Sequence, residues 1–234
     1  MSSRRYPLRS IMSSPGMSTF IWGPLFWDLM TDMAIRMDQA ISNNSKNYNG
    51  IWYALKNILP CKYCRQSYRK FIREDPPARP YTKWVCALQN KVNIKLEKPL
   101  FEWEKFQRRC HVYGSFSSST TWWDIHFILA LNYDPAQKRA AYSQWFQLVP
   151  LMSNLLPYVT FQNTTVPHSV LSSKLTLLRW ITEEYNHQHQ SARTTEFFVR
   201  KYANAIAHKT PEELARLCGP LIVQCQQLDQ KRNK

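Results

Sequence analysis

Apolar side chains recur at three- and four-residue intervals along most of this chain, and this periodicity limits its fold more than any other feature. Ile21, Leu25, Leu29, Met33 and Met37 form the first such series. Spacing of this kind places apolar groups on one face of an α-helix. Only 5 Gly stand against 14 Pro, which suits helices separated by proline-marked loops better than a turn-rich β protein. The sequence therefore predicts an all-α protein.

The helices are expected in two groups, separated by a Ser- and Thr-rich linker at 114–121. The first group is a four- or five-helix bundle over 19–113, and the second is a helical domain of unknown role over 122–234. Residues 1–18 are basic and show little periodicity, so we expect a disordered arm there. The expected helices cover 19–41, 51–59, 60–74, 81–97, 101–112, 122–131, 136–148, 172–189, 194–208 and 211–229.

The chain carries a formal net charge of +15, and 19 of its 31 Lys and Arg residues lie in the first 114 positions. Such an excess suits an anionic cofactor, an acidic partner or nucleic acid, and it also suits a plain solvated surface. No apolar run has the length of a secretory signal or a membrane span. Six Cys are too few for a secreted scaffold built on disulfides. Cysteines that lie close together therefore need a chemical explanation.

Cys61 and Cys64 form a Cys-x-x-Cys pair at the expected start of a helix. The unpaired backbone N–H groups and the helix dipole stabilise a thiolate there. The i, i+3 spacing brings the two sulfurs to bridging distance, and Lys62, Arg65 and Arg69 add positive charge. Because the thiolate is the attacking species in disulfide exchange, the pattern favours a redox pair.

Three other interpretations of the pair are open. A zinc site would need a second pair of ligands, and neither Cys110-His111 nor His187-Gln-His189 has the usual spacing. A thioredoxin-type motif would lie among alternating strands and helices, whereas this neighbourhood is predicted to be all-helical. The third interpretation is a buried structural pair.

Three segments, in order, resemble the Erv/ALR family of FAD-linked sulfhydryl oxidases over about residues 20–112. They are Trp22-Gly-Pro-Leu-Phe-Trp27, Leu59-Pro-Cys-Lys-Tyr-Cys64 followed by Tyr68, and Trp84-Val-Cys-Ala-Leu-Gln-Asn-Lys-Val-Asn-Ile-Lys-Leu-Glu-Lys-Pro99. The resemblance implies a small helical bundle that holds FAD beside the redox pair. It also implies that Cys64 is the flavin-proximal thiol and that Cys61 is the outer thiol, which the substrate attacks.

The FAD contacts that the resemblance implies come from three helices. They are Gly23, Trp27, Thr31, Tyr68, Trp84, Gln89, Asn90, Val92, Asn93, Lys95 and Lys98. Lys91, Lys95 and Lys98 would neutralise the pyrophosphate, although each also suits a solvated helix face.

The sequence departs from the family pattern at positions that bear on activity. Gln89 and Thr31 stand where the family has histidines. Trp103 replaces a cysteine that in many members bonds to the equivalent of Cys86, and this Trp is reminiscent of the oxidases of large DNA viruses. Cys86 is therefore expected either as a buried thiol or paired with Cys110.

Two further cysteines, Cys218 and Cys225, lie in the second helical region. Many family members carry a second redox pair that relays electrons from the substrate, and the resemblance implies this shuttle role as one interpretation. Seven residues span about 10.5 Å of helix, so a bridge would need the helix break that Gly219-Pro220 can provide. Ordinary core cysteines are the simpler interpretation.

The resemblance implies an FAD-dependent thiol oxidase that forms disulfides in a thiol-containing protein, passes the electrons to oxygen and gives hydrogen peroxide. It also implies a homodimer, with FAD as the cofactor and no metal. The alternatives are a catalytically degenerate relative that serves in binding or assembly, and a basic nucleic-acid-binding protein, which is disfavoured. The expected location is the host cytoplasm, and also the virion, if the source is a virus, and otherwise the mitochondrial intermembrane space.

Overall fold

The computed structural model describes residues 19–40, 45–113, 119–159 and 166–202. Every regular element in these ranges is helical, and none of the described residues lies in a strand. The all-α prediction is therefore confirmed. The predicted arm at 1–18 and the predicted helix at 211–229 lie outside the described residues.

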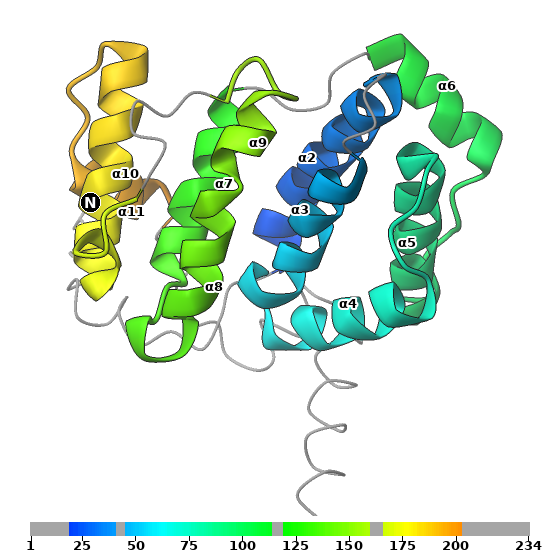
Figure 1. Ribbon diagram of the computed structural model, residues 1–234, viewed down its shortest axis with the longest axis horizontal. Helices are drawn as coiled ribbons and strands as arrows, with labels where there is room; N and C mark the ends of the chain where they lie inside the picture. The colour runs from blue at the N-terminus through cyan, green and yellow to red at the C-terminus, as the bar shows by residue number, and fades with distance from the viewer. Residues whose placement is uncertain (1–18, 41–44, 114–118, 160–165, 203–234) are drawn as a thin grey trace, which may run out of the picture.

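The first half of the chain forms a helical bundle (Figure 1). It consists of α2 (Thr19–Gln39), α3 (Ser45–Ile58), α4 (Lys62–Glu74), α5 (Tyr81–Lys95) and α6 (Trp103–Tyr113). α5 packs along α2, and α4 packs on α3. α4 runs across the lower ends of the other helices of this bundle in Figure 1, so the start of α4, where the predicted redox pair lies, is at the base of the bundle.

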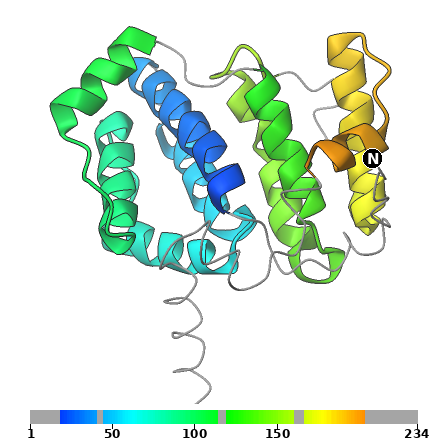
Figure 2. The same cartoon turned by 180° about the vertical axis from the view of Figure 1, so that it is seen from behind.

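The second half adds another layer of helices beside the first. It consists of α7 (Ser119–Leu131), α8 (Pro135–Gln147), the short α9 (Val149–Ser153), a single 3-10 turn at Val170–Ser172, α10 (Lys174–His189) and α11 (Thr195–Lys201). α7 packs against α2 on one side and α10 on the other, and α8 packs against α3. Figures 1 and 2 both show α7 and α8 standing between the α2–α3 pair and α10.

The sequence of α7 explains its central position. Its residues from Ile125 to Leu131 are all buried, as are Trp122 and Trp123. A helix that is apolar around its whole circumference is stable only when other elements surround it. α7 therefore lies between two layers and cannot occupy the surface.

One buried polar contact joins the two halves. The hydroxyl of Tyr158 donates a hydrogen bond to Oδ2 of Asp32 at 2.5 Å, and Asp32 on α2 is fully buried. The apolar core also runs without a break from α2 and α3 into α7 and α8. The division into two domains stays a prediction, but the two halves share one core.

Several predicted boundaries differ from the structure. α3 begins at Ser45, so part of the polar segment predicted as a break is helical. α7 begins at Ser119, inside the predicted linker. α9 was not predicted, because five residues are too few to show periodicity. α11 is described from Thr195 to Lys201, and the rest of the predicted helix to 208 reaches residues outside the described ranges.

Candidate redox site

Cys61 is the residue immediately before α4, and its sulfur caps the helix. Its backbone is extended, with φ −97° and ψ 128°. The backbone N–H of Cys64 donates to Cys61 Sγ at 3.4 Å. The prediction that Cys61 lies inside the helix is therefore wrong by one residue. The first N–H groups of a helix have no partner within it and favour negative charge, so this geometry stabilises a thiolate at Cys61.

Arg65 lies one turn after Cys61 and adds positive charge beside the pair. Its Nη1 donates to the carbonyl oxygen of Leu59 at 2.5 Å, which fixes the guanidinium against the α3–α4 loop. Burial lowers the pKa of Arg65, and negative charge on Cys61 raises it. The two groups therefore lie within electrostatic range, and the guanidinium favours a thiolate.

Tyr68 anchors α4 on α3. Its hydroxyl donates to the carbonyl oxygen of Trp52 at 3.0 Å, and the ring is buried. Burial raises the pKa of Tyr68 well above its ordinary value, so the phenol is neutral. The helix that carries the two half-buried cysteines is thus held by a buried side chain one turn beyond Cys64.

Three predicted cofactor residues lie on one stretch of α2. Thr31 is buried, and its hydroxyl donates to the carbonyl oxygen of Trp27 at 2.8 Å. Trp27 is half-buried. A Cβ atom placed on Gly23 would meet nothing within 4 Å. This stretch of α2 therefore carries a half-buried indole at Trp27 and has open space next to Gly23.

Trp84 on α5 packs in the core of the bundle. Its side chain is buried, its Nε1 donates to the carbonyl oxygen of Asp75 at 3.0 Å, and its ring centroid lies 5.2 Å from that of Trp52. Gln89 and Val92 on the same helix are half-buried. Trp84 thus helps to build the core, while Gln89 and Val92 remain partly accessible.

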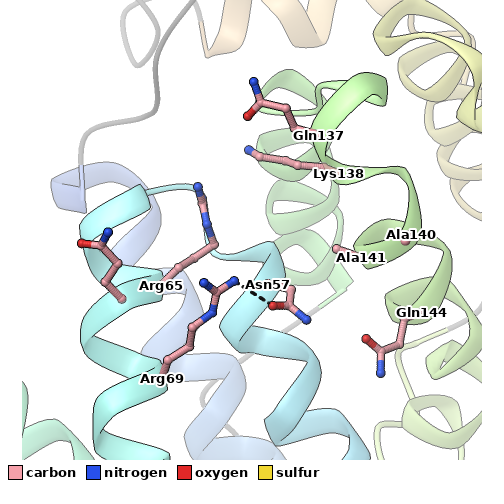
Figure 3. A pocket seen from close by; sticks show the side chains of 9 residues that line it. Asn57, Arg65, Arg69, Gln137, Lys138, Ala140, Ala141 and Gln144 are labelled. Atoms are coloured by element: carbon pink, nitrogen blue, oxygen red, sulfur yellow. Dashed lines mark hydrogen bonds between the residues drawn. The ribbon is translucent and has the colours of Figure 1, made fainter.

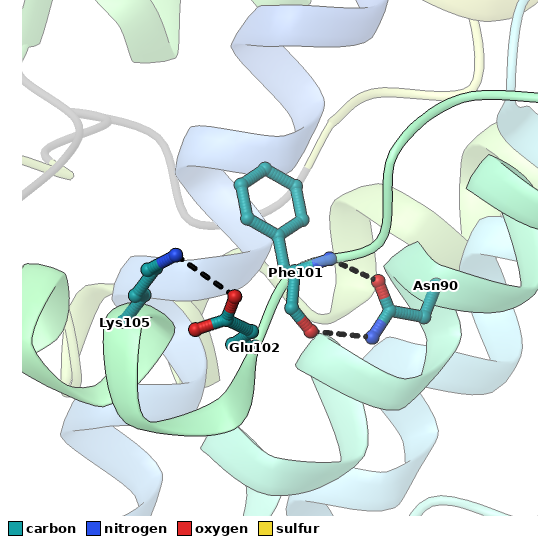
Figure 4. A network of polar contacts seen from close by, with 4 residues as sticks. All are labelled: Asn90, Phe101, Glu102 and Lys105. Atoms are coloured by element: carbon teal, nitrogen blue, oxygen red, sulfur yellow. Dashed lines mark hydrogen bonds and ion pairs between the residues drawn. The ribbon is translucent and has the colours of Figure 1, made fainter.

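Two asparagines of α5 bind the loop that follows the helix. The amide of Asn90 donates to the carbonyl oxygen of Phe101 at 2.9 Å and accepts from the Phe101 N–H at 2.8 Å, as Figure 4 shows. Asn93 donates to the carbonyl oxygen of Pro99 at 3.1 Å. Both predicted cofactor residues therefore position the α5–α6 loop in this structure.

The three lysines predicted to neutralise a pyrophosphate have different surroundings. Lys91 forms an ion pair with Asp75, with 3.2 Å between Nζ and Oδ2. Lys95 Nζ donates to Ser67 Oγ at 2.7 Å and links α5 to α4. Lys98 is exposed. Only Lys98 among them lies wholly on the surface.

Cys86 and Cys110 are not joined by a disulfide in the structure. Burial raises the pKa of Cys86, and burial raises that of Cys110 to about 11 against the opposing effect of the Arg109 charge. Both are therefore protonated near neutral pH and poorly nucleophilic. Cys218 and Cys225 lie outside the described residues.

Sequence reasoning did not predict Asn132, on the α7–α8 turn, as part of this site. Its amide donates to the carbonyl oxygen of Pro60 at 3.0 Å, and its own carbonyl accepts from Lys138 Nζ at 2.8 Å. The residue before Cys61 is thus held by the second half of the chain. No sequence signal could have revealed this contact, because 72 positions separate the two residues.

The described residues also bear on three other possibilities: a metal site, a membrane span and a thioredoxin-type motif. They contain no cluster of three or more His, Cys, Asp or Glu side chains suited to a metal ion. Across the same ranges, no helix combines the length and apolar character needed to cross a bilayer. The neighbourhood of the pair is helical, which differs from the strand–helix setting of a thioredoxin motif.

Comparison with known proteins matches residues 25–111 to the model of the Erv1 / Alr family. The mitochondrial FAD-linked sulfhydryl oxidase ERV1 of Saccharomyces cerevisiae is 41% identical over 56 residues, which cover 21% of this chain and 30% of the yeast protein. The FAD-linked sulfhydryl oxidase ERV1 of Oryza sativa subsp. japonica is 23% identical over 108 residues, which cover 40% of this chain and 56% of the rice protein. The chain thus spans about a third to a half of these relatives, and no solved structure matches it.

Proposed function

Because residues 25–111 form an Erv1 / Alr family domain, we propose that this chain is an FAD-dependent sulfhydryl oxidase that forms disulfides in a thiol-containing protein. The relatives are named as FAD-linked sulfhydryl oxidases. The observation that carries the proposal is the capping geometry of Cys61, whose sulfur accepts the N–H of Cys64 at the start of α4.

The described residues fit an FAD. Gly23 on α2 has open space beside it, and Trp27, one turn further along the helix, carries a half-buried indole; aromatic walls are typical of cofactor pockets. Lys95 and Lys98 supply positive charge that suits a pyrophosphate. Gln89 and Val92 are accessible enough to contact the adenosine part. When bound, the FAD would accept two electrons from the dithiol pair and pass them to oxygen, which yields hydrogen peroxide.

The chain's own residues carry the thiol exchange. A substrate thiolate attacks Cys61 Sγ of the oxidised pair, the Cys61–Cys64 bond breaks, and Cys64 leaves as a thiolate. A second substrate thiolate then attacks the substrate sulfur of the mixed disulfide, and Cys61 leaves as a thiolate. The substrate is oxidised by two electrons, and the pair is reduced by two. The N–H of Cys64 and the guanidinium of Arg65 stabilise the thiolate that leaves at Cys61.

The decisive experiment is the visible absorption spectrum of the purified protein, recorded before and after a dithiol is added in air. A flavin band that bleaches and then recovers with oxygen uptake is the expected result. Cys64→Ser should keep the flavin band and abolish turnover. Cys110→Ser is the matched control, because Cys110 lies away from α4, and it should turn over normally. A colourless protein that cannot be loaded with FAD would contradict the proposal.

A relative without catalytic activity, kept for binding or assembly, is the second candidate. The observation that favours it is that Asn90 and Asn93 bind backbone groups of the α5–α6 loop and so have little capacity left for a cofactor. This candidate requires that the purified chain contain no flavin, so the same spectrum decides between the two functions.

Assembly and location stay predictions. In a homodimer the contact would use a surface other than the faces of α2 and α3 that α7 and α8 cover. The yeast relative is a mitochondrial protein, which supports the intermembrane-space alternative over the host cytoplasm and virion.

A further inference from the structure

A cationic cleft lies beside the redox pair, between α4 and α8 (Figure 3). Its volume is about 510 Å³. The side chains that decide its character are Asn57, Arg65, Gln66, Arg69, Lys138 and Gln144. The rest of its lining consists of one more glutamine and two alanines, and none of the described residues that line it carries a carboxylate. The two halves of the chain therefore enclose a cavity with three cations and amide groups.

The cations of the cleft are not neutralised by the partners that the structure gives them. Arg65 donates to the carbonyl oxygen of Leu59, Arg69 donates to Oδ1 of Asn57 at 2.9 Å, and Lys138 donates to the carbonyl oxygen of Asn132. All three acceptors are uncharged. Burial and the charge of Arg65 lower the pKa of Lys138 to about 8, against the opposing effect of the Asp134 carboxylate, which does not line the cleft. The cleft therefore concentrates positive charge that an anion would stabilise.

The distance between the cleft and Cys61 indicates which part of a substrate the cleft could bind. Arg69 lies eight residues after Cys61, which corresponds to about 12 Å along a helix. An extended peptide rises about 3.3 Å per residue, so about four residues would separate a substrate cysteine bonded to Cys61 from a side chain at Arg69. The cleft is therefore within reach of the residues that flank a substrate thiol at Cys61.

We infer that the cleft formed by Arg65, Arg69 and Lys138 binds an acidic segment of the substrate protein, about three to five residues from the cysteine that attacks Cys61. The inference rests on the proposed oxidase function and names the substrate class of that site. It assigns a role to the second half of the chain, because Lys138 and Gln144 come from α8. Asp and Glu carboxylates would accept charge-assisted hydrogen bonds from the two guanidiniums.

The test compares two dithiol peptides that differ only in charge. One carries three Glu residues three to five positions from its cysteine pair, and the other carries three Gln there. At low salt, kcat/KM for the Glu peptide should exceed that for the Gln peptide about tenfold. The difference should shrink in about 0.5 M salt, because salt screens the attraction between the carboxylates and the cations of the cleft. Equal values for the two peptides at low salt would overturn the inference.

Two variants separate recognition from structure. Arg69→Gln and Lys138→Gln remove one charge each and keep most of the side-chain volume. Each should lower kcat/KM about threefold or more for the Glu peptide, and by a clearly larger factor than for the Gln peptide or for dithiothreitol. Lys70→Gln is the matched control, since Lys70 is exposed, follows Arg69 on the same helix and pairs with Glu74. Equal losses for the Glu and Gln peptides would show a structural role and overturn the inference.

A binding measurement distinguishes failure of this inference from failure of the proposed oxidase. A fluorescent Glu peptide with Ser in place of both Cys cannot react, so its anisotropy with the full chain reports docking alone. Binding that weakens in Arg69→Gln and Lys138→Gln, but not in Lys70→Gln, supports the cleft even if the chain oxidises no thiol. Binding that none of these variants changes, or tighter binding of a single-stranded oligonucleotide at the cleft, overturns the inference.

Discussion

At the scale of single residues, Asn90 has a structural role that its position in the motif does not reveal. Its amide makes two hydrogen bonds to the backbone of Phe101, and the helix and the following loop are joined at that point. A residue matched to a cofactor contact by sequence alone thus also supports the local fold.

Asn90→Ala should lower the free energy of unfolding by about 1–3 kcal/mol, because it leaves a half-buried N–H and C=O of Phe101 without partners. Asn90→Asp can still accept from the N–H but cannot donate, so it should fall between Ala and the parent. Urea denaturation measures both. If Asn90→Ala unfolds at the parent's urea concentration yet loses FAD, the residue serves the cofactor and not the loop.

His126 gives the clearest pH dependence in the chain. It is fully buried among aromatic rings, and burial lowers its pKa to about 4 from 6.5. Trp145 Nε1 can only donate, at 3.2 Å to His126 Nε2, so the single proton lies on Nδ1, which donates to the carbonyl oxygen of Trp122 at 2.9 Å. The neutral ring satisfies both contacts, and a charged ring would not.

Because the pKa of His126 is lower in the folded chain than in the unfolded chain, the unfolded state binds the extra proton between pH 6.5 and about 4. The free energy of unfolding should therefore fall as the pH falls through this range, by up to about 1.4 kcal/mol per pH unit from this residue. His126→Gln should remove that slope, and His168→Gln, at an exposed site, should keep it. Parallel slopes for all three proteins in denaturation series at several pH values would contradict this account.

At the scale of elements, the start of α4 is positioned by three neighbours. Tyr68 fixes it to α3, Lys95 links it to α5, and Asn132 holds Pro60 from the α7–α8 turn. The last of these contacts makes the second half of the chain part of the redox site's support.

Asn132→Ala should release the carbonyl of Pro60 and lower the free energy of unfolding by about 0.5–1.5 kcal/mol. Amide hydrogen exchange at residues 59–64 should become faster, because the loop before α4 loses its tether. Asn154→Ala, at the end of α9, is a control that leaves the α4 loop untouched. Unchanged exchange at 59–64 in Asn132→Ala would show that the contact does not hold the loop.

At the scale of the whole molecule, α7 and α8 cover α2 and α3, and the core passes between them. Asp32 is fully buried at this contact and receives the hydroxyl of Tyr158. The second half therefore covers apolar surface of the first and donates a hydrogen bond to one oxygen of its buried carboxylate.

A chain that ends at residue 113 should associate or aggregate, because the faces of α2 and α3 that α7 and α8 cover would be exposed. Tyr158→Phe tests the polar contact separately in the full chain, and it should lower the free energy of unfolding by about 1–3 kcal/mol. Light scattering and thermal denaturation measure the two effects. A 1–113 fragment that stays monomeric would contradict the first prediction, and a Tyr158→Phe chain with the parent's melting temperature would contradict the second.

Much of the fold follows from local signals. The helix from Thr19, the helix from Tyr81 and the capped start of α10 at Ser173 reflect apolar spacing and helix-capping residues. The boundary at Ser45 was missed because a polar first turn carries no periodicity. The candidate pair Cys61–Cys64 was predictable because its chemistry depends on residues three positions apart.

The sequence alone determined the helical class and the position of the Cys61–Cys64 pair at a helix start, because these depend on spacing within a few residues. Only the tertiary structure decided that Asn132 holds Pro60 and that Lys138 faces Arg65 across a cleft. It also decided that α7 lies inside the molecule between α2 and α10. The physical reason is that these contacts join residues far apart in the sequence, where apolar burial and charge, and not local periodicity, select the neighbours.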